Sequence, residues 1–254
     1  MGHSGKVHTI IENGIAKIRF FHPKSNSLPG ELLRELSNRI TDVSLIPEIR
    51  VIVLESEGEK SFCAGASFDE LISIKNFFEG KKFFSGFAKV INTMRKSGKL
   101  IIARVQGKAV GGGVGLIAAA DYALAVDTAE IKLSELALGL GPFVVGPAVE
   151  RKIGVAAFSE MSIDYEWRSA SWAKEKGLYV NIYSSISELD EAVKNLSEKL
   201  ASANPEATKE LKRIFWQDVQ NWDILLEQRA ELSGRLVLSE FTKNYIEKFK
   251  EIIK

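Results

Sequence analysis

A glycine-rich turn between two apolar segments constrains the fold more than any other feature of this chain. Residues 107–115 hold five glycines, follow the apolar run 100–105 and lead into small residues that suit a helix. Glycine permits positive φ and leaves peptide N–H groups unshielded, and a helix N-terminus adds unpaired N–H donors with partial positive charge. The segment therefore predicts a strand, a tight turn and a helix start that together can hold a phosphate or an oxyanion.

Short apolar runs alternate with helical patterns over the first part of the chain. The predicted strands are 49–54, 100–105, 122–126 and 131–133, and the predicted helices include 32–40, 68–74 and 83–94. Asn13-Gly14 between two alternating runs predicts a hairpin, and the polar segment 55–67 predicts a loop. This alternation predicts an α/β fold with largely parallel pairing. From about Ile186 onward, charged sequence with apolar stripes predicts helices only.

Composition narrows the class of protein. The chain has 254 residues, 45% of them hydrophobic, and a formal net charge of +1. This balance predicts neither nucleic acid nor a membrane surface as partner. We see no signal peptide and no long apolar span, so the sequence predicts a cytoplasmic protein.

The only histidines are His3, His8 and His22 and the only cysteine is Cys63, which argues against a Ser-His-Asp hydrolase, a disulfide and a metal site. Cys63 is predicted to be a small packing residue.

A second turn and a single acid complete the candidate site. Residues 60–68 also follow a buried strand and precede a helix, so two turns can aim N–H groups at one point, as in an oxyanion hole. Glu135 is the only carboxylate between Glu130 and Glu150. Because its surroundings are apolar, we expect its pKa to be raised, which makes it a better base near neutral pH.

These motifs, in this order and spacing, resemble the crotonase superfamily, the enoyl-CoA hydratase/isomerase family. The matching segments are 23–26, 64–66, 111–113, 134–136, 153–154 and 172–178, and with the helical C-terminus they span nearly the whole chain. The resemblance implies an α/β spiral of ββα units followed by a C-terminal helical trimerisation region. The implied division is a crotonase core over 1–187 and a helical oligomerisation region over 188–254, assembled as a homotrimer or hexamer.

The resemblance also implies the ligand and the residues that contact it. The ligand would be a coenzyme A thioester, with no permanently bound cofactor and no metal. The catalytic residues would be Glu135 as base and the N–H groups of Ala66 and Gly112 as donors to the thioester oxygen. The substrate-binding residues would be Lys24, Ser25, Lys60, Ala64, Gly111, Gly115 and Phe143, with the adenine and phosphates near the first four.

Gly115 departs from the pattern of the hydratases in this family. They carry two catalytic glutamates, one just after the glycine triplet and one in the later turn; here these positions hold Gly115 and Glu135. Adding water needs a water molecule deprotonated while a proton reaches carbon, whereas moving a double bond needs one base. The resemblance therefore favours an enoyl-CoA isomerase with one glutamate, and the apolar run 142–147 after Glu135 agrees with it.

Other interpretations remain open from the sequence alone. One is an enoyl-CoA hydratase, including a branched-chain, methylglutaconyl type, that uses Glu135 and a second group such as Asp69 or Glu70. Another is an acyl-CoA-binding homologue without catalytic activity. RNA binding, considered for one relative of the family, has little support because the charge is balanced. A dinucleotide motif over 113–118 is disfavoured because such motifs usually open the first βαβ unit.

Overall fold

A six-stranded sheet forms the centre of the molecule. The computed structural model describes residues 5–253, so His3 lies outside the described residues. The strand order is β1-β2-β3-β5-β7-β9. The bounds are β1 Lys6–Glu12, β2 Ile15–Phe21, β3 Val51–Ser56, β5 Leu100–Val105, β7 Tyr122–Val126 and β9 Asn181–Tyr183.

The pairing within this sheet confirms the predicted topology. β1 and β2 form an antiparallel hairpin across Asn13 and Gly14, which both have positive φ, and the other neighbours pair in parallel. All six residues of β3 are buried, as are five of the six in β5. Continuous apolar runs are typical of parallel strands covered on both faces, which is why these two strands were predictable.

A second, three-stranded parallel sheet lies beside the first, in the order β4-β6-β8. Its strands are β4 Ser61–Cys63, β6 Lys108–Val110 and β8 Ile131–Lys132. The predicted loop over 55–67 was wrong for β4, and β6 and β9 were not predicted. Strands of three residues carry too little alternation to stand out from a loop, and β4 and β6 form because each pairs with a distant segment.

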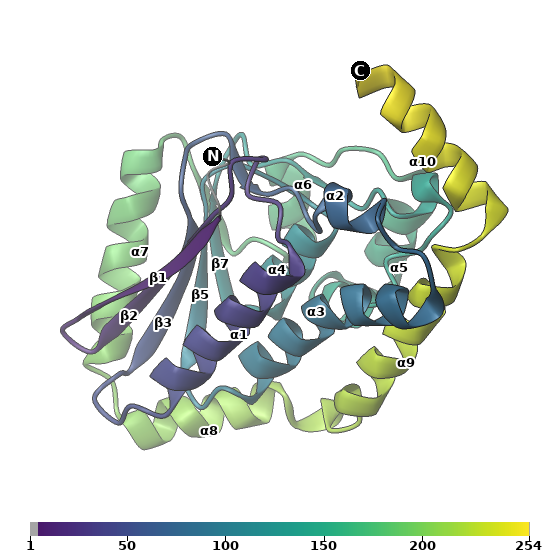
Figure 1. Ribbon diagram of the computed structural model, residues 1–254. Coiled ribbons are helices and arrows are strands. Elements are labelled where there is room, and N and C mark those ends of the chain that lie inside the picture. The colour runs from purple at the N-terminus through teal and green to yellow at the C-terminus, as the bar shows by residue number, and fades with distance from the viewer. Residues whose placement is uncertain (1–4, 254) are drawn as a thin grey trace.

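Helices cover both faces of the main sheet (Figure 1). On one side lie α1 (Gly30–Ser44) and α3 (Phe77–Lys96), and on the other lies α7 (Ile186–Ala201). The remaining helices are α2 Phe68–Leu71, α4 Gly112–Ala119, α5 Gly146–Asp164, α6 Ala170–Glu175, α8 Pro205–Phe215, α9 Trp222–Leu236 and α10 Glu240–Ile253, with short 3₁₀ turns η1 Leu136–Leu138 and η2 Gln217–Val219. The chain after Ile186 is helical, as its pattern predicts.

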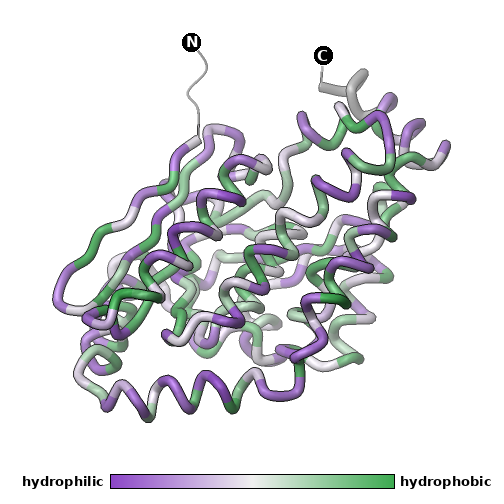
Figure 2. The backbone as a smooth tube through the Cα atoms, turned by 60° about the horizontal axis from the view of Figure 1, so that its bottom comes forward, coloured by the Kyte–Doolittle hydropathy of each residue, from purple (hydrophilic) through white to green (hydrophobic). Residues whose placement is uncertain are grey.

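The C-terminal helices pack directly on the core. A Cβ atom added to Gly80 of α3 would lie 2.8 Å from the carbonyl oxygen of Gly234 in α9, so these two helices approach at backbone distance. Figure 2 shows hydrophobic segments in the interior and a largely hydrophilic α8 across one end of the molecule. No helix in the described range is both long and apolar enough to cross a bilayer.

Candidate active site

A largely apolar cavity of about 490 Å³ lies between α2, α3, the start of α4 and the segment 134–145. Most of its walls are hydrophobic, including Phe83, Phe84 and Phe87 of α3. Other apolar lining residues include Phe68, Leu71, Leu138, Leu140, Pro142, Phe143, Val144 and Val145. A cavity of this size with few polar groups suits a small organic ligand.

The two glycine turns meet at one side of this cavity. Gly65 has φ +86°, and a Cβ atom there would lie 2.9 Å from the carbonyl oxygen of Val110 and 3.4 Å from the amide nitrogen of Gly112. A Cβ atom on Gly113 would lie 2.5 Å from the carbonyl oxygen of Cys63. The turns can approach this closely only because both positions lack side chains.

Two peptide N–H groups have no hydrogen-bond partner where the turns meet. Leu28 donates to Gly65 O at 2.8 Å and accepts from Ser67 N at 3.3 Å, so the N–H of Ala66 between them points away from Leu28. Gly112 is the first residue of α4, whose opening N–H groups lack an intrahelical acceptor. Among the described residues neither N–H has an acceptor, and both residues line the cavity. This arrangement can bind an oxyanion.

Glu135 precedes η1 and lines the same cavity. Its Oε2 atom is buried and has no hydrogen-bond partner among the described residues. Burial raises the pKa of the carboxyl to about 7, while the backbone N–H groups of Glu135 and Ser134 act in the opposite direction. A carboxyl group with this pKa exchanges protons readily near neutral pH.

Glu135 is the only acid among the described residues that line this cavity. Gly115 does not line it: a Cβ atom there would lie 2.5 Å from Cγ1 of Val145, so Val145 fills the space that a larger residue would need. Asp69 pairs with Lys24 at 2.5 Å, and Glu70 accepts a hydrogen bond from Gly30 N at 2.8 Å. Neither acid lines the cavity.

The candidate substrate-binding residues separate into two groups. Ala64, Gly111 and Phe143 line the cavity, together with Ala66 and Gly112. Lys24, Ser25 and Lys60 do not line it. Ser25 is nevertheless adjacent, because its carbonyl oxygen accepts from Ala64 N at 3.1 Å, and Lys60 O accepts from Lys108 N at 3.2 Å beside the same small sheet.

Four polar residues of the cavity lining were not predicted from the sequence: Lys132, Tyr165, Ser233 of α9 and Tyr245. Lys132 lies on β8, three residues before Glu135, with its ammonium 5.8 Å from the centre of the Trp167 ring. Tyr165 directly follows the last residue of α5 and has φ +44°, and Tyr245 comes from α10. Lys132 could have been predicted, because it lies on the predicted strand 131–133 and that strand pairs at Val110, next to the glycine turn. No sequence signal links the two tyrosines to Glu135.

Cys63 is a buried packing residue, as predicted, and burial raises its thiol pKa to about 12. A thiol with this pKa is not a nucleophile near neutral pH. Among residues 5–253 no group of three or more His, Cys, Asp or Glu side chains is arranged to hold a metal ion.

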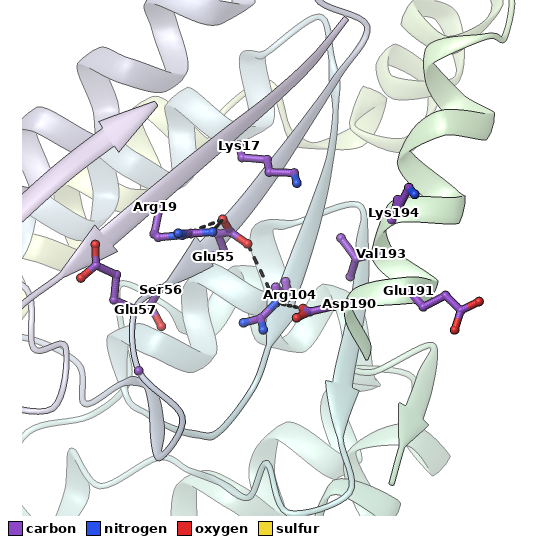
Figure 3. Close-up of a pocket in the computed structure, with 11 residues that line it drawn as sticks. Lys17, Arg19, Glu55, Ser56, Glu57, Arg104, Asp190, Glu191, Val193 and Lys194 are labelled. Carbon is purple, nitrogen blue, oxygen red and sulfur yellow. Dashed lines mark hydrogen bonds and ion pairs between the residues drawn. The ribbon is translucent and has the colours of Figure 1, made fainter. Parts of the chain in front are cut away.

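A second large cavity, of about 560 Å³, lies between the main sheet and α7 and is strongly charged (Figure 3). Its charges pair with one another: Arg19 Nη2 lies 2.7 Å from Glu55 Oε1, and Arg104 Nε lies 2.5 Å from Asp190 Oδ1. Figure 3 shows these ion pairs as a chain across the cavity. Because its most buried charges compensate each other, this cavity is the weaker candidate for catalysis.

Comparison with known proteins identifies the family of the chain. The profile of the enoyl-CoA hydratase/isomerase family matches residues 10–252. The chain is 29% identical over 243 residues to a short-chain-enoyl-CoA hydratase of Clostridium acetobutylicum, covering 94% of this chain and 92% of that protein. It is 29% identical over 247 residues to a carnitinyl-CoA dehydratase of Escherichia coli, covering 95% and 89%.

A solved structure supports the same assignment at the level of the fold. The crystal structure of an enoyl-CoA hydratase from Bacillus halodurans superposes with a TM-score of 0.89 at 23% identity, covering 95% of this chain and 99% of that one. The predicted crotonase fold with a helical C-terminal region is therefore confirmed. The chain belongs to the enoyl-CoA hydratase/isomerase family of the crotonase superfamily, and it is an acyl-CoA enzyme of that family.

Proposed function

We propose that this protein moves the double bond of an enoyl-CoA, with Glu135 as the only residue that transfers protons. The observation that carries the proposal is that Glu135 is the single acid among the described residues of the cavity. Its pKa of about 7 suits both removal and return of a proton. Val145, which packs against Gly115, leaves no room there for a second carboxylate.

The proposed reaction proceeds through an enolate of the thioester. Glu135 removes a proton from C2 of a 3-enoyl-CoA, and the electrons shift onto the thioester oxygen. The N–H groups of Ala66 and Gly112 then donate to that oxygen, each typically worth about 3–4 kcal/mol in the transition state. Glu135 returns the same proton to C4, which gives the conjugated 2-enoyl-CoA without consuming water.

The apolar walls support proton return over water addition. Phe143 and Val144 line the cavity with the phenylalanines of α3, so little polar surface is available to hold a reacting water molecule. We propose that Ala64 contacts the thioester portion, with Ser25, Lys24 and Lys60 next to it along the coenzyme. The homotrimer or hexamer and the absence of a permanent cofactor stay predictions, and sedimentation tests the first of them.

Hydration of an enoyl-CoA is the second candidate function. Two features favour it: the relatives are named enoyl-CoA hydratase and carnitinyl-CoA dehydratase, and the cavity lining includes Tyr165, whose hydroxyl can donate a proton. In that reaction Glu135 would deprotonate water and a second group would protonate C2. An acyl-CoA-binding homologue without activity is the third candidate.

Turnover of a 3-enoyl-CoA and of crotonyl-CoA, followed by the absorbance of the conjugated thioester, separates these candidates. We expect the 3-enoyl-CoA to gain conjugation while crotonyl-CoA stays unchanged. Glu135→Gln should reduce this rate by about 10²–10⁴ and leave binding of the CoA ester nearly intact. Loss of conjugation from crotonyl-CoA would instead establish hydration. A wild-type protein that also fails to exchange the α-proton of a saturated acyl-CoA into deuterated water would be a binding protein.

A further inference from the structure

A third cavity, of about 430 Å³, lies between the C-terminal end of α3 and the segment formed by α8 and η2. Five cationic side chains line it, and Glu210 is the only acid among the described lining residues. The cations are Arg95, Lys96, Lys209, Lys212 and Arg213. Figure 2 shows α8 as a largely hydrophilic helix at this end of the molecule. The balanced charge of the whole chain therefore conceals a local excess of positive charge.

The carboxylates around this cavity do not compensate all five cations. Arg95 and Lys96 share Asp223, at 3.2 Å and 2.7 Å. Lys212 pairs with Asp121 at 2.6 Å, and Arg213 pairs with Glu210 at 2.7 Å. Three carboxylates therefore form ion pairs with four cations.

Lys209 adds a fifth positive charge without a partner. Among the described residues its ammonium makes no ion pair and no side-chain hydrogen bond. Nearby cations also disfavour one another's charged forms. The pKa of Lys99, next to this cavity, is lowered first by burial and then by Arg50 and Lys209. An anion bound here would relieve that repulsion.

Arg95 provides a preoriented binding group at the base of the cavity. Its side chain is only 8% exposed, its Nε donates to Asn92 Oδ1 at 3.1 Å and its Nη2 donates to Asp223. Its Nη1 atom has no acceptor among the described residues, although Arg95 lines the cavity. A guanidinium held in place with free N–H donors matches the geometry of a phosphate group. The side-chain amides of Gln217 and Gln220 supply neutral donors at the rim.

We propose that this cavity is a binding site for a small phosphate-bearing anion. It is separate from the cavity lined by Glu135 and the two glycine turns, which we call the acyl-CoA cavity. The phosphate would accept from Arg95 Nη1 and lie against the ammonium groups of Lys96 and Lys209. The two cavities are carried by the same helix: Phe87 of α3 lines the acyl-CoA cavity and Arg95 lies two turns later, about 12 Å along the helix axis. The proposed site therefore needs no contribution from Glu135 or from the glycine turns.

Isothermal titration calorimetry at constant ionic strength tests the site with three probes: inorganic phosphate, pyrophosphate and ADP. We expect saturable binding of at least one probe to the wild-type protein. The preferred probe distinguishes a free phosphate from a phosphate ester that needs its nucleoside. Lys209→Ala should weaken binding about tenfold, the typical effect of removing one charge-assisted hydrogen bond. Since Lys209 is exposed and unpaired, this substitution should not affect folding.

Two control variants locate the binding event. Lys194→Ala removes an exposed cation of α7 that lines the charged cavity beside the main sheet and not this one, and should leave the affinity unchanged. Lys24→Ala removes a cation that we place along the coenzyme, so it should leave the affinity for inorganic phosphate and pyrophosphate unchanged, whereas ADP, a fragment of coenzyme A, also reports binding at the coenzyme. The proposal is overturned if no probe binds, if Lys209→Ala binds as tightly as wild type, or if Lys24→Ala alone abolishes binding of inorganic phosphate and pyrophosphate.

Discussion

A Cβ atom on Gly111 would lie 2.8 Å from Oε1 of Glu135, closer than any non-bonded contact of this kind tolerates. Gly111 also has φ +51° and ψ −112°, a conformation that residues with side chains rarely adopt. The backbone of the first helix turn and the buried carboxylate therefore occupy adjacent positions that only glycine permits. One residue thus sets both the start of α4 and the position of Glu135.

We predict that Gly111→Ala loses most of its activity while the protein still folds. The added methyl must displace either the Glu135 carboxylate or the N–H of Gly112, and a small misplacement of catalytic groups typically costs about 10²-fold in rate. The backbone strain should lower the free energy of unfolding by about 1–2 kcal/mol. Steady-state kinetics and urea unfolding measure the two effects. Wild-type kcat in Gly111→Ala would show that this contact does not position Glu135.

The pKa of Glu135 predicts the pH dependence of catalysis. The carboxylate form is the base, so kcat/KM should rise about tenfold per pH unit at low pH and level off above a pKa of about 7. A rate profile between acidic and alkaline pH with a stable acyl-CoA substrate measures this value. Glu191→Gln, which changes an exposed acid outside the acyl-CoA cavity, should have the same profile. A profile with no inflection near neutral pH would contradict the assigned base.

The same raised pKa predicts that Glu135→Gln stabilises the protein at alkaline pH. In the folded protein the carboxyl has a pKa of about 7, against a reference value of 4.5. The folded state therefore holds this proton more tightly, and stability falls as the pH rises from 4.5 to 7. The total loss is about 3 kcal/mol.

Replacing Glu135 by glutamine removes this loss. Urea unfolding at fixed protein concentration should give equal stabilities near pH 4.5 and a more stable variant above pH 7. Glu191→Gln serves again as the matched control, since its carboxyl is exposed. A constant difference at all pH values would show that packing, rather than ionisation, separates the two proteins.

The contact between Gly115 and Val145 predicts a reciprocal effect of two substitutions. Gly115→Ala should destabilise the protein by about 1–3 kcal/mol because its methyl overlaps Cγ1 of Val145. Val145→Ala opens the space that this methyl needs, so the double variant should be more stable than the sum of the single effects predicts. Urea unfolding of the four proteins gives the coupling energy. Additive effects would mean that Val145 moves aside at little cost.

Local patterns in the sequence predicted the elements whose signals are long and regular. β3 and β5 are continuous apolar strands, and α1 places Leu32, Leu36 and Ile40 on one buried face. β4, β6 and β9 escaped prediction because three residues carry no clear period. The division at residue 187 and the assembly into a homotrimer or hexamer stay predictions.

Some features of the candidate site could likewise be predicted from the sequence, and others depend on the tertiary structure. The glycine turns and Glu135 were predictable because positive φ and an acid within an apolar run are local properties of the chain. Only the fold decided that Val145 fills the space beside Gly115, that Lys132 and Tyr165 enter the cavity, and that Lys24 and Lys60 stay outside it. These relationships join segments far apart in the chain, and side-chain packing determines them; backbone propensity does not.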